Sequence, residues 1–127
     1  MNIPEHYQKV RDVDITSDEL IKFEDRVKNA YESAQVKGPI HLAKNNESKL
    51  IELFQYIHPD DWVFSAWRNH YHALLHGVDP EELFKGICEG RSMGTNNTNP
   101  NFYASSIVGG IIPLALGTAA GLKRSNS

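Results

Sequence analysis

The sequence has little cysteine, no excess of positive charge and no long uninterrupted apolar run, and each shortage excludes a class of protein. The single cysteine excludes an internal disulfide framework and is compatible with a reducing compartment. The net charge is -3 and the 13 Lys and Arg residues are scattered, which argues against a nucleic-acid partner. The longest apolar stretch, 107–122, is broken by five glycine or proline residues, so we expect no membrane span.

What is present is typical of one small globular domain. The chain has 127 residues, with 40% hydrophobic and 23% charged residues. Residues 1–6 have neither the apolar core of a signal peptide nor the Arg- and Ser-rich pattern of a transit peptide. We therefore expect a soluble, cytoplasmic protein in which residues 1–15 form an arm.

Capping signals and apolar spacing predict four helices and one strand. Thr16 and Glu19 fit a capping box at the start of the first helix. Gly77 is a natural end for the third helix, and Asp79 with Pro80 is a natural start for the fourth. The predicted helices cover about 16–36, 45–57, 69–76 and 80–90, and a short buried strand covers 62–65.

The last third of the sequence changes character. Residues 91–103 form a polar, asparagine-rich stretch that we expect to be a mobile or binding loop without a core. An extended segment, a tight Gly109-Gly110 passage and a helix that opens near Pro113 are expected to follow. Glycine permits close approach of a ligand, but a buried glycine turn without a ligand explains the pattern equally well.

Two groups of residues could carry chemistry. His70, His72 and His76 lie close together in sequence, yet no local cysteine or carboxylate completes a zinc site, so buried hydrogen-bonding histidines are the simpler interpretation. Arg68 follows an apolar strand and enters a helix, where a guanidinium can bind a phosphate; a surface ion pair is the alternative.

A series of short motifs occurs in a fixed order between about residues 31 and 123. The motifs are His41-Leu42 with Asn45-Asn46-Glu47, Pro59-Asp60-Asp61-Trp62-Val63-Phe64-Ser65, Trp67-Arg68-Asn69-His70, Gly77-Val78-Asp79-Pro80-Glu81-Glu82-Leu83, Gly90-Arg91-Ser92-Met93, and Ile107-Val108-Gly109-Gly110 with Pro113. In this order and spacing the chain resembles the alpha subunit of thiamine-diphosphate-dependent 2-oxo acid dehydrogenases of the pyruvate dehydrogenase type.

The resemblance implies a fold, an activity and partners. The fold would be α/β, with amino-terminal helices followed by the first part of a thiamine-diphosphate-binding, transketolase-like parallel-sheet domain over residues 16–127. The complete enzyme would use thiamine diphosphate and Mg²⁺ to decarboxylate a 2-oxo acid oxidatively and transfer the acyl group to lipoamide. Its partners would be a beta subunit, in an assembly of two alpha and two beta subunits, and a lipoyl-bearing acyltransferase.

The resemblance also assigns roles to individual residues. Arg68 would bind the cofactor diphosphate, with Trp67 at a position where the family usually has a tyrosine. Val108 would offer backbone hydrogen bonds to the aminopyrimidine ring, next to Ser106, which replaces a usual glycine. As catalytic residues, the resemblance implies two histidines that line the approach to the active site and stabilise charge, His41 and His70.

Several departures from the family pattern bear on activity. Asn45-Asn46 replaces Gly-Gln, Tyr71 replaces a glycine, and Gly94 stands where the family typically has a histidine. The Gly-Asp-Gly and asparagine motif that completes the magnesium site does not occur, so no metal ligand is assigned. We therefore expect the front portion of a longer subunit, inactive alone; half of a split enzyme and a non-catalytic relic or interaction module are the alternatives.

Overall fold

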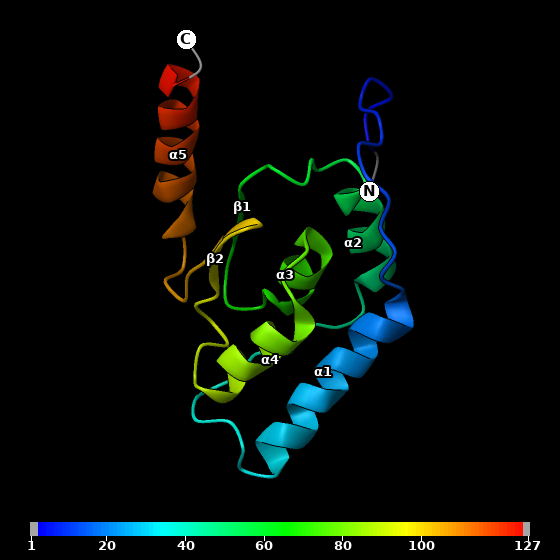
Figure 1. Ribbon diagram of the computed structural model, residues 1–127, viewed down its shortest axis with the longest axis vertical. Helices are drawn as coiled ribbons and strands as arrows, with labels where there is room; N and C mark the ends of the chain where they lie inside the picture. The colour runs from blue at the N-terminus through cyan, green and yellow to red at the C-terminus, as the bar shows by residue number, and fades with distance from the viewer. Residues whose placement is uncertain (1–2, 126–127) are drawn as a thin grey trace.

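The computed structural model describes residues 3–125, and this part of the chain contains five helices and a three-stranded sheet. The elements are, in order, α1 (Ser17–Glu32), α2 (Glu47–Phe54), β1 (Val63–Ser65), α3 (His70–His76), α4 (Pro80–Cys88), β2 (Asn96–Thr98), β3 (Asn101–Ala104) and α5 (Ile111–Ser125). The mixture of helices with a small sheet agrees with the α/β expectation (Figure 1).

Local capping chemistry sets the start of α1 and the end of α3 where the sequence predicts them, whereas α1 ends at Glu32, before the predicted position 36, because Ala34 has φ = 59°. The Thr16 hydroxyl accepts a hydrogen bond from the Glu19 amide at 3.2 Å and caps α1. Gly77 ends α3 with φ = 110°, a left-handed conformation that glycine adopts without strain. The prediction for α2 was too long, because Asn45 has φ = 71° and cannot be helical, and residues 55–57 form a turn.

The core lies where α1 crosses the shorter helices. α1 contacts α2, α3 and α4, and α3 in turn contacts β1 (Figure 1). Apolar residues at helical spacing on α1, such as Leu20 and Val27, have no exposed surface. The largest enclosed side chains outside α1 are Tyr71, Ile87 and Phe102, so α3, α4 and the sheet all contribute to one core.

The sheet has the order β1-β3-β2 and is mixed. β1 and β3 are parallel, with Val63 opposite Phe102 and Ser65 opposite Ala104, whereas β2 pairs with β3 in the antiparallel direction. The prediction of a coreless loop over residues 91–103 was therefore wrong. Two of its asparagines begin strands, and Phe102 has no exposed surface because alternate residues of β3 face the core.

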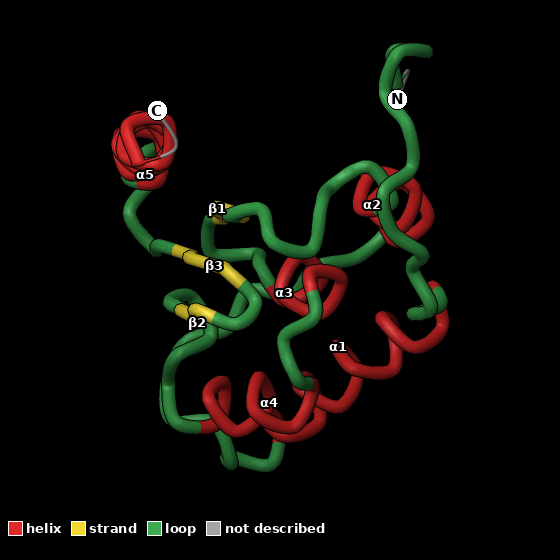
Figure 2. Tube along the Cα trace, turned by 45° about the horizontal axis from the view of Figure 1, so that its top comes forward, coloured by secondary structure: helices red, strands yellow, loops and turns green. Residues whose placement is uncertain are grey.

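Helix α5 stands beside β1 and away from the helical body (Figures 1 and 2). It begins at Ile111, two residues before Pro113, which confirms a helix here. The extended segment expected directly before it is wrong, because β3 ends at Ala104 and residues 106–110 are bends and turns. Ile112 and Leu116 are 68% and 72% exposed, as expected for a helix whose apolar faces are poorly covered.

A groove of about 480 Å³ separates α5 from β1. Its lining is mostly apolar and includes Phe64 from the strand and Ala119 from the helix. Despite the apolar character of α5, no helix within residues 3–125 combines the length and hydrophobicity needed to cross a membrane.

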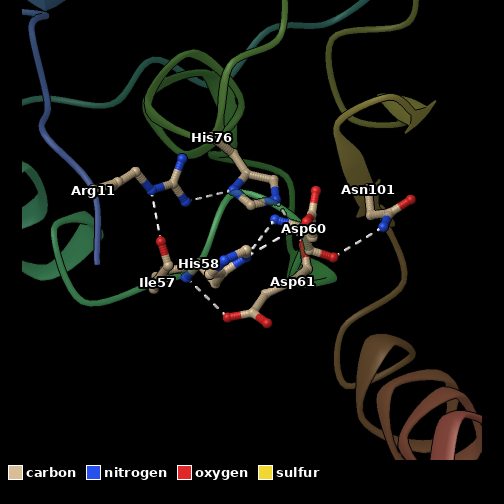
Figure 3. Close-up of polar contacts among 7 residues, drawn as sticks. All are labelled: Arg11, Ile57, His58, Asp60, Asp61, His76 and Asn101. Carbon is tan, nitrogen blue, oxygen red and sulfur yellow. Dashed lines mark hydrogen bonds and ion pairs between the residues drawn. The ribbon is translucent and has the colours of Figure 1, made fainter. Parts of the chain in front are cut away.

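The segment from residue 3 to residue 16 has no helix or strand, but Arg11 fastens it to the domain. Its guanidinium donates to the Ile57 carbonyl at 2.6 Å and to His76 Nδ1 at 2.7 Å (Figure 3). It also donates to the Leu75 carbonyl at 3.3 Å. It also lies over the Phe54 ring, 5.5 Å from the centroid. The predicted arm is therefore bound to the ends of α2 and α3.

The turn before β1 is held from two sides. His76 Nε2 donates to the Asp61 carbonyl at 2.7 Å, and the Asn101 side chain donates to the Asp60 carbonyl at 3.1 Å (Figure 3). Since Asn101 is the first residue of β3, this contact ties the amino ends of the two parallel strands to each other.

Candidate functional site

The carboxyl ends of β1 and β3 bring two predicted binding segments together. The strands are parallel neighbours, so the chain leaves both at the same edge of the sheet. The Ser105 amide donates to the Ser65 carbonyl at 3.1 Å, which continues the pairing one residue past β3. Residues 66–69 and 105–110 therefore emerge side by side. In open α/β sheets this edge is the usual place for a ligand.

The first segment presents a cation and an indole. Arg68 is exposed, and it makes no hydrogen bond or ion pair with another residue of the described part, 3–125. Trp67 is 36% exposed, and its ring lies 5.6 Å from that of His41 at an interplanar angle of 31°. The pair places an imidazole and a possible indole donor together, and the exposed guanidinium of Arg68 belongs to the next residue of the chain.

The second segment is a tight turn with exposed backbone. Val108 is 76% exposed, and Ser106 is exposed as well. Gly109 has φ = 75°, which an L-residue adopts only with strain. A Cβ built on Gly110 would lie 3.1 Å from the Cβ of Ile107, so the turn is closely packed there. The glycine pair is needed for the turn itself.

The donor set fits a diphosphate but not, by itself, a metal ion. A free guanidinium can bind a diphosphate through two parallel hydrogen bonds. A Cβ added at Gly109 would meet no atom within 4 Å, so a ligand can approach the backbone there. Within residues 3–125, no three His, Cys, Asp or Glu side chains are grouped closely enough to hold a metal ion.

His70 lies apart from the other predicted residues. It is the first residue of α3 and has no exposed surface. Its Nδ1 is 2.6 Å from Glu24 Oε1 and its Nε2 is 2.8 Å from Ser92 Oγ, so both ring nitrogens are engaged within the chain. The imidazole is enclosed beneath the segment that carries Arg68.

The two other histidines of α3 have separate partners. His72 Nδ1 is 2.6 Å from the Ser65 hydroxyl, and burial lowers the pKa of this histidine. Burial also lowers the pKa of His76, and the charge of Arg11 lowers it further. Because arginine can only donate, His76 Nδ1 is the acceptor and Nε2 carries the proton, so the ring is neutral.

Sequence reasoning missed the buried residues that support the site. Asn69 has no exposed surface and joins the carbonyls of Trp67 and Ser92. Glu24 is 5% exposed although it lies on a helix with a polar face. A carboxylate next to the apolar stripe of α1 was the available signal for Glu24. Asn69, between Arg68 and His70, gave no signal of its own.

Comparison with known proteins agrees with the motifs. Residues 16–127 match the sequence pattern of the dehydrogenase E1 component family. The mitochondrial alpha subunit of the pyruvate dehydrogenase E1 component of Dictyostelium discoideum is 31% identical over 97 residues, which cover 70% of this chain and 26% of the relative. The alpha subunit of acetoin:2,6-dichlorophenolindophenol oxidoreductase of Bacillus subtilis (strain 168) is 30% identical over 111 residues, which cover 80% and 33%.

A third relative is the alpha subunit of the pyruvate dehydrogenase E1 component of Zymomonas mobilis, with 30% identity over 116 residues, which cover 83% of this chain and 33% of the relative. The chain belongs to the dehydrogenase E1 component family, and its resemblance to alpha subunits is confirmed. It spans 26% to 33% of the length of these relatives.

Proposed function

We propose that residues 16–127 are one part of the alpha subunit of a thiamine-diphosphate-dependent 2-oxo acid dehydrogenase, with a transketolase-like fold in the whole subunit. The complete enzyme would oxidatively decarboxylate a 2-oxo acid and pass the acyl group to lipoamide. The observation that supports this most is the edge of the sheet where residues 66–69 and 105–110 leave adjacent parallel strands.

Each exposed residue at this edge has a proposed task. Arg68 holds the diphosphate with two hydrogen bonds, and the Trp67 indole N–H donates to the same group. The backbone at Val108 and Ser106 hydrogen-bonds the aminopyrimidine ring, for which an open turn is required. His41, whose ring lies next to that of Trp67, faces the substrate side and stabilises negative charge there. His70 supports this edge from beneath.

The remaining parts of the proposed enzyme come from outside the described residues. Thiamine diphosphate, when bound, supplies the electron sink for decarboxylation. Magnesium would be bound by residues other than those of this chain; within residues 3–125 no three His, Cys, Asp or Glu side chains are grouped closely enough to hold an ion. A beta subunit and a lipoyl-bearing acyltransferase are the proposed partners. The residues of this chain bind and orient the cofactor, and His41 adds charge stabilisation.

Titration of the ¹⁵N-labelled chain with inorganic pyrophosphate tests the assignment. We expect the amide signals of residues 67–69 and 106–110 to shift together. Arg68→Ala should weaken binding about tenfold, the loss typical of one charged hydrogen-bond pair at an exposed site. Lys28→Ala removes the same charge from an exposed position of α1 and serves as the matched control. Equal affinity of the Arg68→Ala and Lys28→Ala variants would contradict the proposal.

A further inference from the structure

Beneath the proposed diphosphate-binding segment, buried polar side chains form a continuous hydrogen-bonded series. Glu24 Oε1 lies 2.6 Å from His70 Nδ1, and His70 Nε2 lies 2.8 Å from Ser92 Oγ. The Ser92 carbonyl accepts from the Asn69 side chain at 2.9 Å, and the same amide nitrogen donates to the Trp67 carbonyl at 3.3 Å. The series thus runs from α1 to the backbone of the site.

The carboxylate, imidazole and hydroxyl have the order of a hydrolytic triad, but their burial excludes that chemistry. Ser92 and His70 have no exposed surface, and Glu24 is 5% exposed. A nucleophile must reach the reacting atom of a substrate, and no substrate can approach the buried Ser92 hydroxyl. The series instead joins α1, the start of α3 and the segment that follows α4.

Its members are costly to bury, which argues for a geometric role. Glu24 Oε2 and Asn69 Oδ1 are enclosed and have no hydrogen-bond partner among residues 3–125. An unpaired buried polar atom costs free energy, and apolar side chains of similar shape would join these elements without that cost. Apolar contacts cannot hold two carbonyl groups at a fixed separation. The side-chain amide nitrogen of Asn69 does so by donating one hydrogen bond to each carbonyl.

We propose that Asn69 and Glu24 are positioning residues for the diphosphate-binding segment. Asn69 fixes the backbone at Trp67 relative to Ser92, and Glu24 fixes Ser92 through His70. Arg68, which follows Trp67, therefore has a fixed backbone, although its side chain makes no hydrogen bond or ion pair within residues 3–125. The ligand in this inference rests on the proposed function, whereas the positioning rests on the hydrogen bonds.

The test uses the full chain and two conservative variants. Asn69→Asp keeps the size and the preference for a helix start, but it places a carboxylate oxygen where the amide donor faced two carbonyls. Glu24→Gln keeps an acceptor for His70 and removes the charge. Asn29→Asp, on the exposed side of α1, is the matched control for the added charge.

¹⁵N relaxation measures the positioning directly, and inorganic pyrophosphate measures its consequence. We expect Asn69→Asp to lower the backbone order parameters of residues 66–68 from about 0.85, the value of rigid backbone, toward about 0.6, while those in the core of α1 stay unchanged. Glu24→Gln should lower the order parameters at 66–68 and 91–93 by a smaller amount, and it should alter the ¹⁵N shifts of the His70 ring. Pyrophosphate affinity should fall in both variants and remain constant in Asn29→Asp.

The outcomes separate the two proposals. Unchanged order parameters at residues 66–68 in a folded Asn69→Asp variant overturn the positioning role, whether or not pyrophosphate binds. Lower order parameters there, combined with a wild-type chain that does not bind pyrophosphate, support the positioning and overturn the diphosphate assignment. If Asn69→Asp does not fold, Glu24→Gln decides by the same comparison: unchanged order parameters and unchanged His70 shifts overturn the role.

Discussion

Replacing Arg11 by methionine measures how strongly the amino-terminal segment is attached. Arginine here donates to the Ile57 carbonyl, to the Leu75 carbonyl and to His76, at 2.6, 3.3 and 2.7 Å. Hydrogen bonds from a charged donor contribute about 1.5–3 kcal/mol each when buried, but this guanidinium is partly exposed and one bond is long. Methionine retains the apolar contact with Phe54, so we expect the free energy of unfolding to fall by about 2–3 kcal/mol.

The cost of this substitution should depend on pH. Burial, and then the Arg11 charge, hold the pKa of His76 below its ordinary value of 6.5, so the unfolded chain binds a proton more readily than the folded chain. The stability that depends on a neutral His76 is therefore fully present above pH 6.5, and it declines as the pH falls below 6.5. Without Arg11, Nδ1 is free to bind a proton and the pKa of His76 rises. The variant thus loses less stability on acidification than the wild type does.

Thermal unfolding at pH 7.5 and at pH 5 measures both effects. At pH 7.5 we expect a lower Tm by about 8 °C, and at pH 5 a smaller difference. Arg91→Met breaks the exposed ion pair with Glu89 and should cost less than about 0.5 kcal/mol at either pH. Equal costs for Arg11→Met at the two pH values would refute the coupling to His76. A cost no larger than that of Arg91→Met would refute the contribution of the Arg11 side chain to the attachment.

Three further substitutions test the turn before α5, α5 itself and the core beneath α2. Gly109→Ala should lower the free energy of unfolding by about 1–2 kcal/mol because φ is 75° there. Gly117→Ala, with open space around it inside α5, should raise helix stability by up to about 1 kcal/mol. Thermal unfolding that moves the Tm of both variants in the same direction would contradict this. Tyr71→Phe removes the 2.8 Å hydrogen bond to Glu47 and should lower the free energy of unfolding by about 1–2 kcal/mol. Burial, followed by this bond, raises the pKa of Tyr71. Absorbance titration at alkaline pH should therefore leave one of the five tyrosines protonated in the folded wild type.

The sequence predicts those parts of the fold that depend on neighbouring residues. A threonine three residues before a glutamate and an aspartate before a proline specify helix starts through bonds within one turn, and Thr16 and Asp79 make these bonds. Gly77 ends its helix for an equally local reason. The prediction for the polar stretch over residues 91–103 was wrong because β3 depends on a partner strand nearly forty positions earlier. A central strand of four residues also carries too few apolar residues to be recognised.

In the candidate site, too, local features could be predicted from the sequence, whereas features that depend on distant residues could not. The position of Arg68 after a strand and of Gly109 before a helix could be predicted, because each follows from local composition. Their proximity could not be predicted from spacing, since it requires β1 and β3 to pair in parallel. The burial of Glu24 and Asn69 was equally out of reach, because it depends on His70 and Ser92, which come from other elements.

The central position of β3 also orders the events of synthesis. β1 has no sheet partner until residues 101–104 have been made, because β3 separates it from β2. The helices α1 to α4 can pack on one another before that point, because all of their residues precede β3 in the chain. A chain emerging from the ribosome therefore acquires its helical body first. The edge that carries Arg68 becomes a two-sided site only when the last strand inserts.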